Sequence, residues 1–161
     1  MEYLSLSNDE YFSVSAGVSV SPKEETYWGD ETAYVVPVDL TQNDGVAGVT
    51  ETKKSLSMVG LEKVRNKVNP INTILVLRSG FRIPRIGILN IPAVISHRFL
   101  AVEIKDENQL LPEYVALMLD SSKKQISHFS IGNTMLHLKR DIALSMQIPL
   151  IPLEEQKKIL S

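Results

Sequence analysis

Three arginines follow the most apolar stretch of the chain within eight residues. The stretch 70–77 reads as a short central strand rich in Ile, Leu and Val. Arg78, Arg82 and Arg85 come directly after it, with Gly80, Phe81 and Pro84 between them. A guanidinium can donate two parallel hydrogen bonds to guanine O6 and N7 or to a phosphate. This unmixed positive set favours a DNA contact over an ordinary solvated charge cluster.

A second group of candidate base-reading side chains lies in a predicted turn. Thr41, Gln42 and Asn43 precede Asp44-Gly45, which is a hairpin signal. Asn and Gln can hydrogen-bond adenine bidentately, and Thr can place its methyl against that of thymine. The same residue types also build ordinary turns, so both interpretations stay open.

Charge is strongly partitioned along the chain, although the net charge is only −2 and the pI is about 5.9. Residues 1–62 carry 11 acidic and 3 basic side chains, whereas residues 63–102 carry 7 basic side chains and no acidic one. Residues 121–140 are also free of acids. The two blocks contain these bases: Lys63, Arg65, Lys67, Arg78, Arg82, Arg85, Arg98, Lys123, Lys124, Lys139 and Arg140. Such blocks can face phosphates, unless folding neutralises them against the acidic blocks.

Catalytic signatures are missing from the sequence. There is no phosphate-binding GxxxxGK[ST], no HExxH, no GxSxG and no cysteine. Glu103-Ile104-Lys105 resembles half of a nuclease motif, but the upstream aspartate that would complete it is missing, because residues 73–93 contain no acid. We therefore expect no catalytic residues, no metal and no cofactor in this chain.

Targeting signals are equally sparse. Met1 is followed by Glu2 rather than by a basic and apolar leader, and no apolar run approaches the length of a membrane span. Zero cysteines exclude disulfides and thiolate zinc sites. These features predict a cytoplasmic protein.

Hydrophobic patterning predicts an α+β fold, a single mixed domain with a twisted, largely antiparallel sheet and a few helices. The first ten residues are polar and predicted to be loosely held; Gly17 indicates a bulge or a close backbone approach. Trp28 is predicted to anchor a polar loop over 21–32, and His97 to be a structural histidine within a strand. The predicted strands are 11–20, 33–40, 49–57, 70–77, 86–90 and 93–104, and the predicted helices are 58–67 and 110–129.

The last thirty residues combine four predicted pieces in a fixed order. A polar turn at 131–134 is followed by a short helix at 139–145 and by an apolar run at 146–150. Pro149 restricts that run to an edge strand or a strand end. Pro152 then begins a helix in which Glu154 and Lys158 are spaced for an ion pair.

This order of pieces resembles the end of a target-recognition domain from the DNA-specificity subunit of type I restriction-modification systems. The resemblance is strongest over Gly132–Leu138 and Ile148–Ile159, and a looser one extends toward the start of the chain. It implies a domain that reads one half of a two-part site in double-stranded DNA. It also implies a partner methyltransferase subunit that supplies the methylation chemistry and, through it, a restriction subunit.

The resemblance further implies two recognition domains joined by two long helices. On this basis residues 1–151 form one DNA target-recognition domain, and residues 152–161 begin a helix that leads to a second recognition domain or a second copy. Two alternatives remain: a recognition domain within a fused restriction-methylation enzyme, and a protein-interaction module that binds an acidic partner through the arginines.

Overall fold

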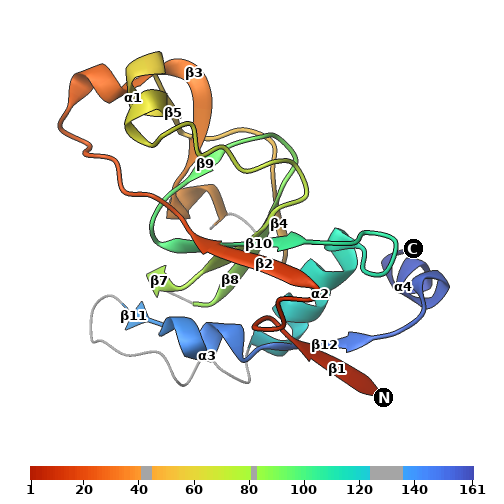
Figure 1. Ribbon diagram of the computed structural model, residues 1–161. Coiled ribbons are helices and arrows are strands. Elements are labelled where there is room, and N and C mark those ends of the chain that lie inside the picture. Colours follow the sequence, from red (N-terminus) through yellow and green to blue (C-terminus); the bar gives the residue numbers. More distant parts are fainter. Residues whose placement is uncertain (41–44, 81–82, 124–135) are drawn as a thin grey trace.

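The structure is a computed structural model that describes residues 1–40, 45–80, 83–123 and 136–161. These ranges form four small sheets and four α-helices, in agreement with the predicted α+β class (Figure 1). No helix in these ranges is both long and apolar enough to span a membrane.

A five-stranded sheet forms the centre of the fold. Its order is β2-β10-β6-β8-β4, and all neighbours are antiparallel except β4 and β8. The central position of β6 confirms the prediction for 70–77, because Ile74–Leu77 is buried at every residue. The strands are β2 (Phe12–Ala16), β4 (Ala47–Val49), β6 (Ile74–Leu77), β8 (Arg85–Leu89) and β10 (Phe99–Ile104).

One helix, α2 (Pro112–Ser122), packs on this sheet and supplies the other half of the core. Pro112 lies in its first turn, where a missing N–H costs nothing, as predicted. Tyr114, Val115 and Leu119 are buried against the sheet. The Tyr114 hydroxyl donates to the carbonyl of Pro149 (2.7 Å), which ties the helix to the C-terminal part of the chain.

A second, smaller sheet lies on one side of the first, at the top of Figure 1. Its order is β5-β3-β9, and the helix α1 (Met58–Lys63) and the 3₁₀ turn η1 (Glu25–Tyr27) pack beside it. The prediction of a strand over 33–40 is partly wrong, because the strand begins earlier and Pro37–Leu40 forms the 3₁₀ helix η2. The strands are β3 (Trp28–Val35), β5 (Lys54–Leu56) and β9 (Val94–Ile95).

Trp28 anchors this sheet, as predicted, although it lies in a strand rather than in a loop. Its indole N–H donates to the carbonyl of Ser21 (3.1 Å), and its ring meets the edge of Tyr34 with centroids 5.4 Å apart. The half-buried indole therefore joins the polar segment before it to the small core.

The single strand predicted over 93–104 is wrong, since the chain turns between β9 and β10 and enters two different sheets. The turn forms where Gly17 crosses: a Cβ there would lie 2.0 Å from the Ser96 carbonyl oxygen. The Ser96 hydroxyl accepts from Arg98 N (3.2 Å) and closes the turn. The predicted close approach at Gly17 is thus confirmed, and it is what links the two sheets.

The first ten residues are not loosely held. Glu2–Ser5 forms β1, antiparallel to β12 (Gln147–Leu150), and Leu4 and Leu6 are buried in the main core. Within the described residues β12 pairs with β1 alone, which confirms its prediction as an edge strand.

The C-terminal helices appear where the sequence predicts them, as α3 (Arg140–Leu144) and α4 (Leu153–Leu160). The predicted Glu154–Lys158 pair is replaced by an ion pair between Glu154 and Lys157 at 3.2 Å. α4 is fixed to the domain by Gln156, whose side chain is fully buried and bonded to the loop that precedes α2.

Candidate nucleic-acid interface

Three distant parts of the chain meet where β6 ends. The chain passes from Arg78 into β7 (Ser79–Gly80), which pairs with β11 (Leu136–His137). Arg78 N donates to the Arg98 carbonyl (3.1 Å), and Leu138 N donates to the Arg78 carbonyl (2.7 Å). We name the cationic and imidazole side chains around this point the arginine junction: Arg78, Arg98, His137, Lys139 and Arg140.

Arg78 is the most unusual side chain of the arginine junction. It is half-buried, and its Nε has no hydrogen-bond partner among the described residues. Burial, and secondly the charge of Arg140, lower the pKa of the Arg78 guanidinium from its ordinary value. Both effects disfavour the charged form, yet arginine stays protonated in proteins. The Nε itself lies below the surface, so a ligand from outside can meet only the exposed part of this half-buried cation. Among the described residues no carboxylate forms an ion pair with Arg78, so an anion from outside would neutralise it.

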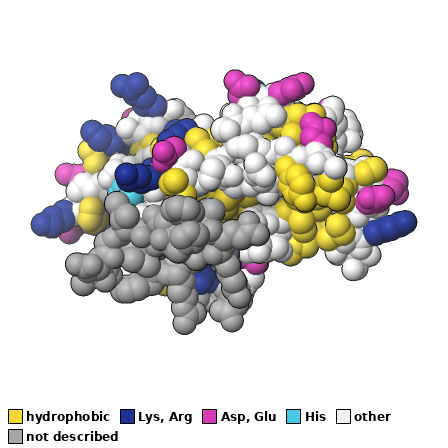
Figure 2. All heavy atoms as spheres, turned by 90° about the horizontal axis from the view of Figure 1, so that it is seen from below, with side chains coloured by type: hydrophobic (Ala, Val, Ile, Leu, Met, Phe, Trp, Pro, Cys, Tyr) yellow, Lys and Arg dark blue, Asp and Glu magenta, His cyan; other side chains and the backbone are white. Residues whose placement is uncertain are grey.

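The other junction residues surround Arg78 at the surface. His137, Lys139 and Arg140 are exposed, and Arg98 is half-buried. Lys139 is the N-cap residue of α3 and Arg140 is its first residue. Cations are disfavoured at a helix N-terminus, so helix stability does not explain them. Figure 2 shows several Lys and Arg side chains and a His side chain toward the left of the view, with Asp and Glu side chains among them.

Arg85 does not belong to this surface, contrary to the prediction that it contacts DNA. It is 6% exposed, and its Nη2 donates to the carbonyl of Leu40 at 2.9 Å. Leu40 is itself fully buried, and its side chain packs closely against Gly87 of β8. A Cβ at position 87 would lie only 2.9 Å from the Leu40 side chain. Arg85 therefore stabilises the packing of the end of η2 against β8 in the interior of the domain. We exclude it from the proposed DNA contacts.

This placement gives a testable prediction for Arg85. Replacing it with methionine keeps most of the apolar stem but leaves the Leu40 carbonyl without this donor, which should cost about 1–3 kcal/mol in the free energy of unfolding. Urea denaturation of Arg85→Met measures that loss. If Arg85→Met is as stable as the parent but binds DNA more weakly, Arg85 contacts DNA after all.

The remaining predicted site residues fall into two groups. Lys123 is half-buried at the end of α2 and ion-paired with Asp120 at 2.8 Å, so its charge is already partly neutralised. The others lie outside the described residues: Thr41, Gln42, Asn43, Arg82 and Lys124.

Two histidines lie at or near the junction, and neither was predicted to be part of the site. His97 was predicted to be a structural histidine, but it is exposed in the turn before β10. His137 is exposed in β11, and no local pattern in the sequence indicates that it pairs with Ser79.

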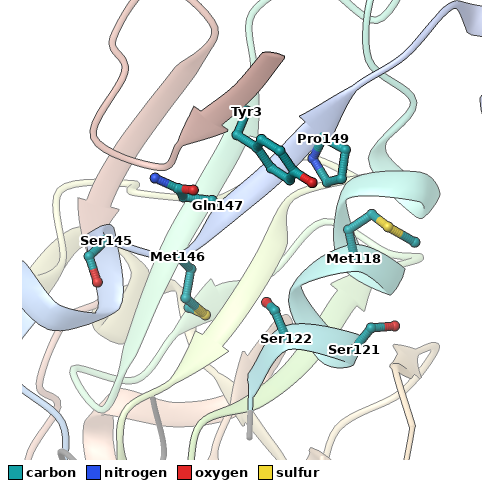
Figure 3. A pocket seen from close by; sticks show the side chains of 8 residues that line it. All are labelled: Tyr3, Met118, Ser121, Ser122, Ser145, Met146, Gln147 and Pro149. Atoms are coloured by element: carbon teal, nitrogen blue, oxygen red, sulfur yellow. The ribbon is translucent and has the colours of Figure 1, made fainter. Parts of the chain in front are cut away.

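A cavity of about 370 Å³ lies apart from the junction, between the end of α2 and the β1–β12 pair (Figure 3). Its described lining contains hydroxyl, thioether and amide groups but no Asp, Glu, His, Lys or Arg. No group of three His, Asp or Glu side chains in the described part of the chain could hold a metal ion. This lining offers no acid-base pair for catalysis.

Comparisons with solved structures identify the same fold in other proteins. A chain from a structure of complex assembly and conformational transition of a type I R-M system matches with a TM-score of 0.69 and 18% identity, over 99% of this chain and 36% of that one. The S subunit of the type I restriction-modification system from M. genitalium matches with a TM-score of 0.64 and 15% identity, over 98% and 36%. The HsdS subunit from Thermoanaerobacter tengcongensis matches with a TM-score of 0.63 and 16% identity, over 99% of this chain and 35% of that one.

The chain thus spans about a third of the length of these structures. A family model described as the type I restriction modification DNA specificity domain matches residues 10–161, which is nearly the whole chain. Together with the α+β architecture and the cationic junction at the end of β6, this match shows that the chain belongs to the family of type I restriction modification DNA specificity domains.

Proposed function

We propose that this domain recognises the sequence of double-stranded DNA through the arginine junction, and that it reads one half of a bipartite site. The observation that carries this proposal is Arg78, a half-buried cation beside Arg140 that no carboxylate among the described residues neutralises. Base edges and phosphates supply the acceptors that such a group requires.

Two layers of contact follow from the exposure of the junction residues. The backbone of Arg78 is fixed by hydrogen bonds through both its N–H and its carbonyl, and its side chain is half-buried, so we assign the base contact to this arginine. Arg98, Lys139 and Arg140 surround it and provide charge for phosphates, which fix orientation without reading sequence. On sequence grounds alone, Arg82, Lys124 and the 41–43 segment remain further proposed contacts.

The partners follow from the family rather than from the arginine junction. We propose that a methyltransferase subunit, and a restriction subunit through it, act on the DNA that this domain selects. The domain itself would carry no catalytic residue and bind no cofactor. A second recognition domain or a second copy of the chain would read the other half-site.

A salt titration tests the phosphate layer. Each phosphate neutralised by a cation contributes about 0.9 to the slope of log affinity against log salt. The double variant Lys139→Gln, Arg140→Gln should therefore flatten the slope on duplex DNA by about 1.8. The control Lys157→Gln, Lys158→Gln removes the same charge from α4 and should leave the slope unchanged. Equal slopes for both variants and the parent would remove the junction from the interface, and absence of binding to any duplex would favour a protein-interaction module.

A further inference from the structure

A second cationic cluster lies outside the arginine junction, at the turn that follows α1. Lys63, Arg65 and Lys67 are all exposed there. We propose that these three residues form a phosphate-binding arm that grips the backbone of the same duplex, beyond the bases that Arg78 contacts. The inference rests on the proposed DNA recognition and states where the backbone contact extends.

Backbone hydrogen bonds and two left-handed residues define the turn that carries the arm. Arg65 and Asn66 both adopt a positive φ of 57°, so the chain reverses within two residues. Arg65 N donates to the Glu62 carbonyl and Asn66 N to the Leu61 carbonyl, both at 2.9 Å. A turn whose backbone is already fixed loses little conformational freedom when a ligand binds.

The residue type at position 65 is informative because its backbone conformation favours other residues. A left-handed φ is easy for glycine and tolerable for asparagine, whereas a longer side chain costs about 1 kcal/mol there. Asn66 follows this preference and Arg65 does not. The turn geometry alone therefore gives no reason for arginine, and an exposed guanidinium that meets an anion does.

Two hydrogen bonds and the start of β10 lie between the arm and the arginine junction. Lys67 Nζ donates to the carbonyl of Ala16 (2.6 Å), at the end of β2. The next residue, Gly17, donates its N–H to the carbonyl of Phe99 (3.1 Å), which follows Arg98 of the junction. In Figure 1, α1, the start of β10, β7 and β11 follow one another down the left side. One extended ligand along that side would meet both clusters.

Shape and charge at the arm fit a polyanion. An open hollow of about 600 Å³ is bordered by Lys63, Arg65, Lys67 and the Val18–Ser19 backbone segment. Glu62 precedes the arm, and the sequence contains no further acid until Glu103. Three cations beside a shallow hollow suit the repeating charges of a nucleic acid backbone.

The double variant Lys63→Gln, Arg65→Gly separates this role from a structural one. Glycine relieves the left-handed position, and Lys63→Gln gives up only the exposed contact of its ammonium with the Tyr27 ring, 6.0 Å from the ring centroid. The melting temperature should therefore change little. The slope of log affinity against log salt on duplex DNA should nevertheless become shallower by about 1.8. The ratio of affinities for a preferred and a scrambled duplex should not change, because phosphate contacts carry no sequence information.

The Lys157→Gln, Lys158→Gln variant provides the charge-matched control on α4, at the opposite end of Figure 1. If glycine lowers the melting temperature, Arg65→Asn replaces it in the same double variant. An unchanged slope for the arm variant, with a flattened slope for Lys139→Gln, Arg140→Gln, overturns the arm and leaves the recognition proposal standing. Unchanged slopes for both variants overturn the recognition proposal as well.

Discussion

Arg78→Met should abolish discrimination at one position of the DNA site while leaving the domain folded. Loss of a bidentate contact to a base costs about 1–3 kcal/mol, which corresponds to roughly 5- to 150-fold in affinity for the preferred duplex. Affinity for a duplex changed at that one base pair should fall much less. Competition binding with the preferred duplex and its single-base variants measures both quantities.

Stability provides the first control for this variant. Burial and Arg140 lower the pKa of Arg78, which means that its charged form is disfavoured in the folded state. Removing that charge should therefore not lower the melting temperature beyond the small loss of stem packing. Arg78→Lys provides the second control, because lysine keeps the charge but loses the planar fork. If Arg78→Lys binds like the parent, Arg78 contacts phosphate and does not read a base.

Gln156→Leu should be the most destabilising substitution near the C-terminus. The Gln156 side chain is fully buried and satisfies three backbone groups: Oε1 accepts from Leu111 N (2.9 Å), and Nε2 donates to the carbonyls of Gln109 (2.8 Å) and Ile151 (2.9 Å). Each buried group left without a partner costs roughly 1–3 kcal/mol. The total should be at least about 3 kcal/mol, or a fall in melting temperature of about 6–12 °C.

The matched control for Gln156→Leu is Lys158→Leu, which places the same side chain at an exposed position of α4. Calorimetry of both variants should show a large shift only for Gln156→Leu. Melting temperatures within 1–2 °C of each other would show that α4 is not fixed through this amide. Because Gln156 joins the start of α4 to the start of α2, its loss should also free the direction in which α4 leaves the domain.

The parts of the fold that the sequence predicts well are those whose signals are local. Pro112 begins α2 and Pro152 immediately precedes α4, each at a position where proline is favoured, and the apolar residues after Pro70 form the central strand. Pro149 likewise restricts β12 to the edge of a sheet. In each case one residue type limits the backbone within a few positions.

The errors occur where a distant partner decides the local structure. The polar start of the chain becomes β1 only because β12, more than 140 residues away, pairs with it. The strand predicted over 93–104 breaks at Ser96, where Gly17 approaches just after the end of β2, although the segment contains no glycine to signal a turn. Neither partner is visible in the local pattern.

The sequence predicted that the candidate site would be rich in basic residues, but not which of them lie together in space. Arg78 and Arg98 come together because β6 and β10 are neighbours, and β11 adds Arg140 through its pairing with β7. Arg85 belongs to the same run of arginines as Arg78, and the sequence does not distinguish the two. Arg85 nevertheless begins a strand that is buried at every position. Only the sheet decides which arginine faces solvent.

Selection from a random duplex pool tests most directly whether this domain selects a DNA sequence through the arginine junction. Duplexes retained by the parent chain should share one short motif, and Arg78→Met should lose the preference at one position of that motif. Retained duplexes without a common motif, or the same motif with every position intact in Arg78→Met, would contradict the account.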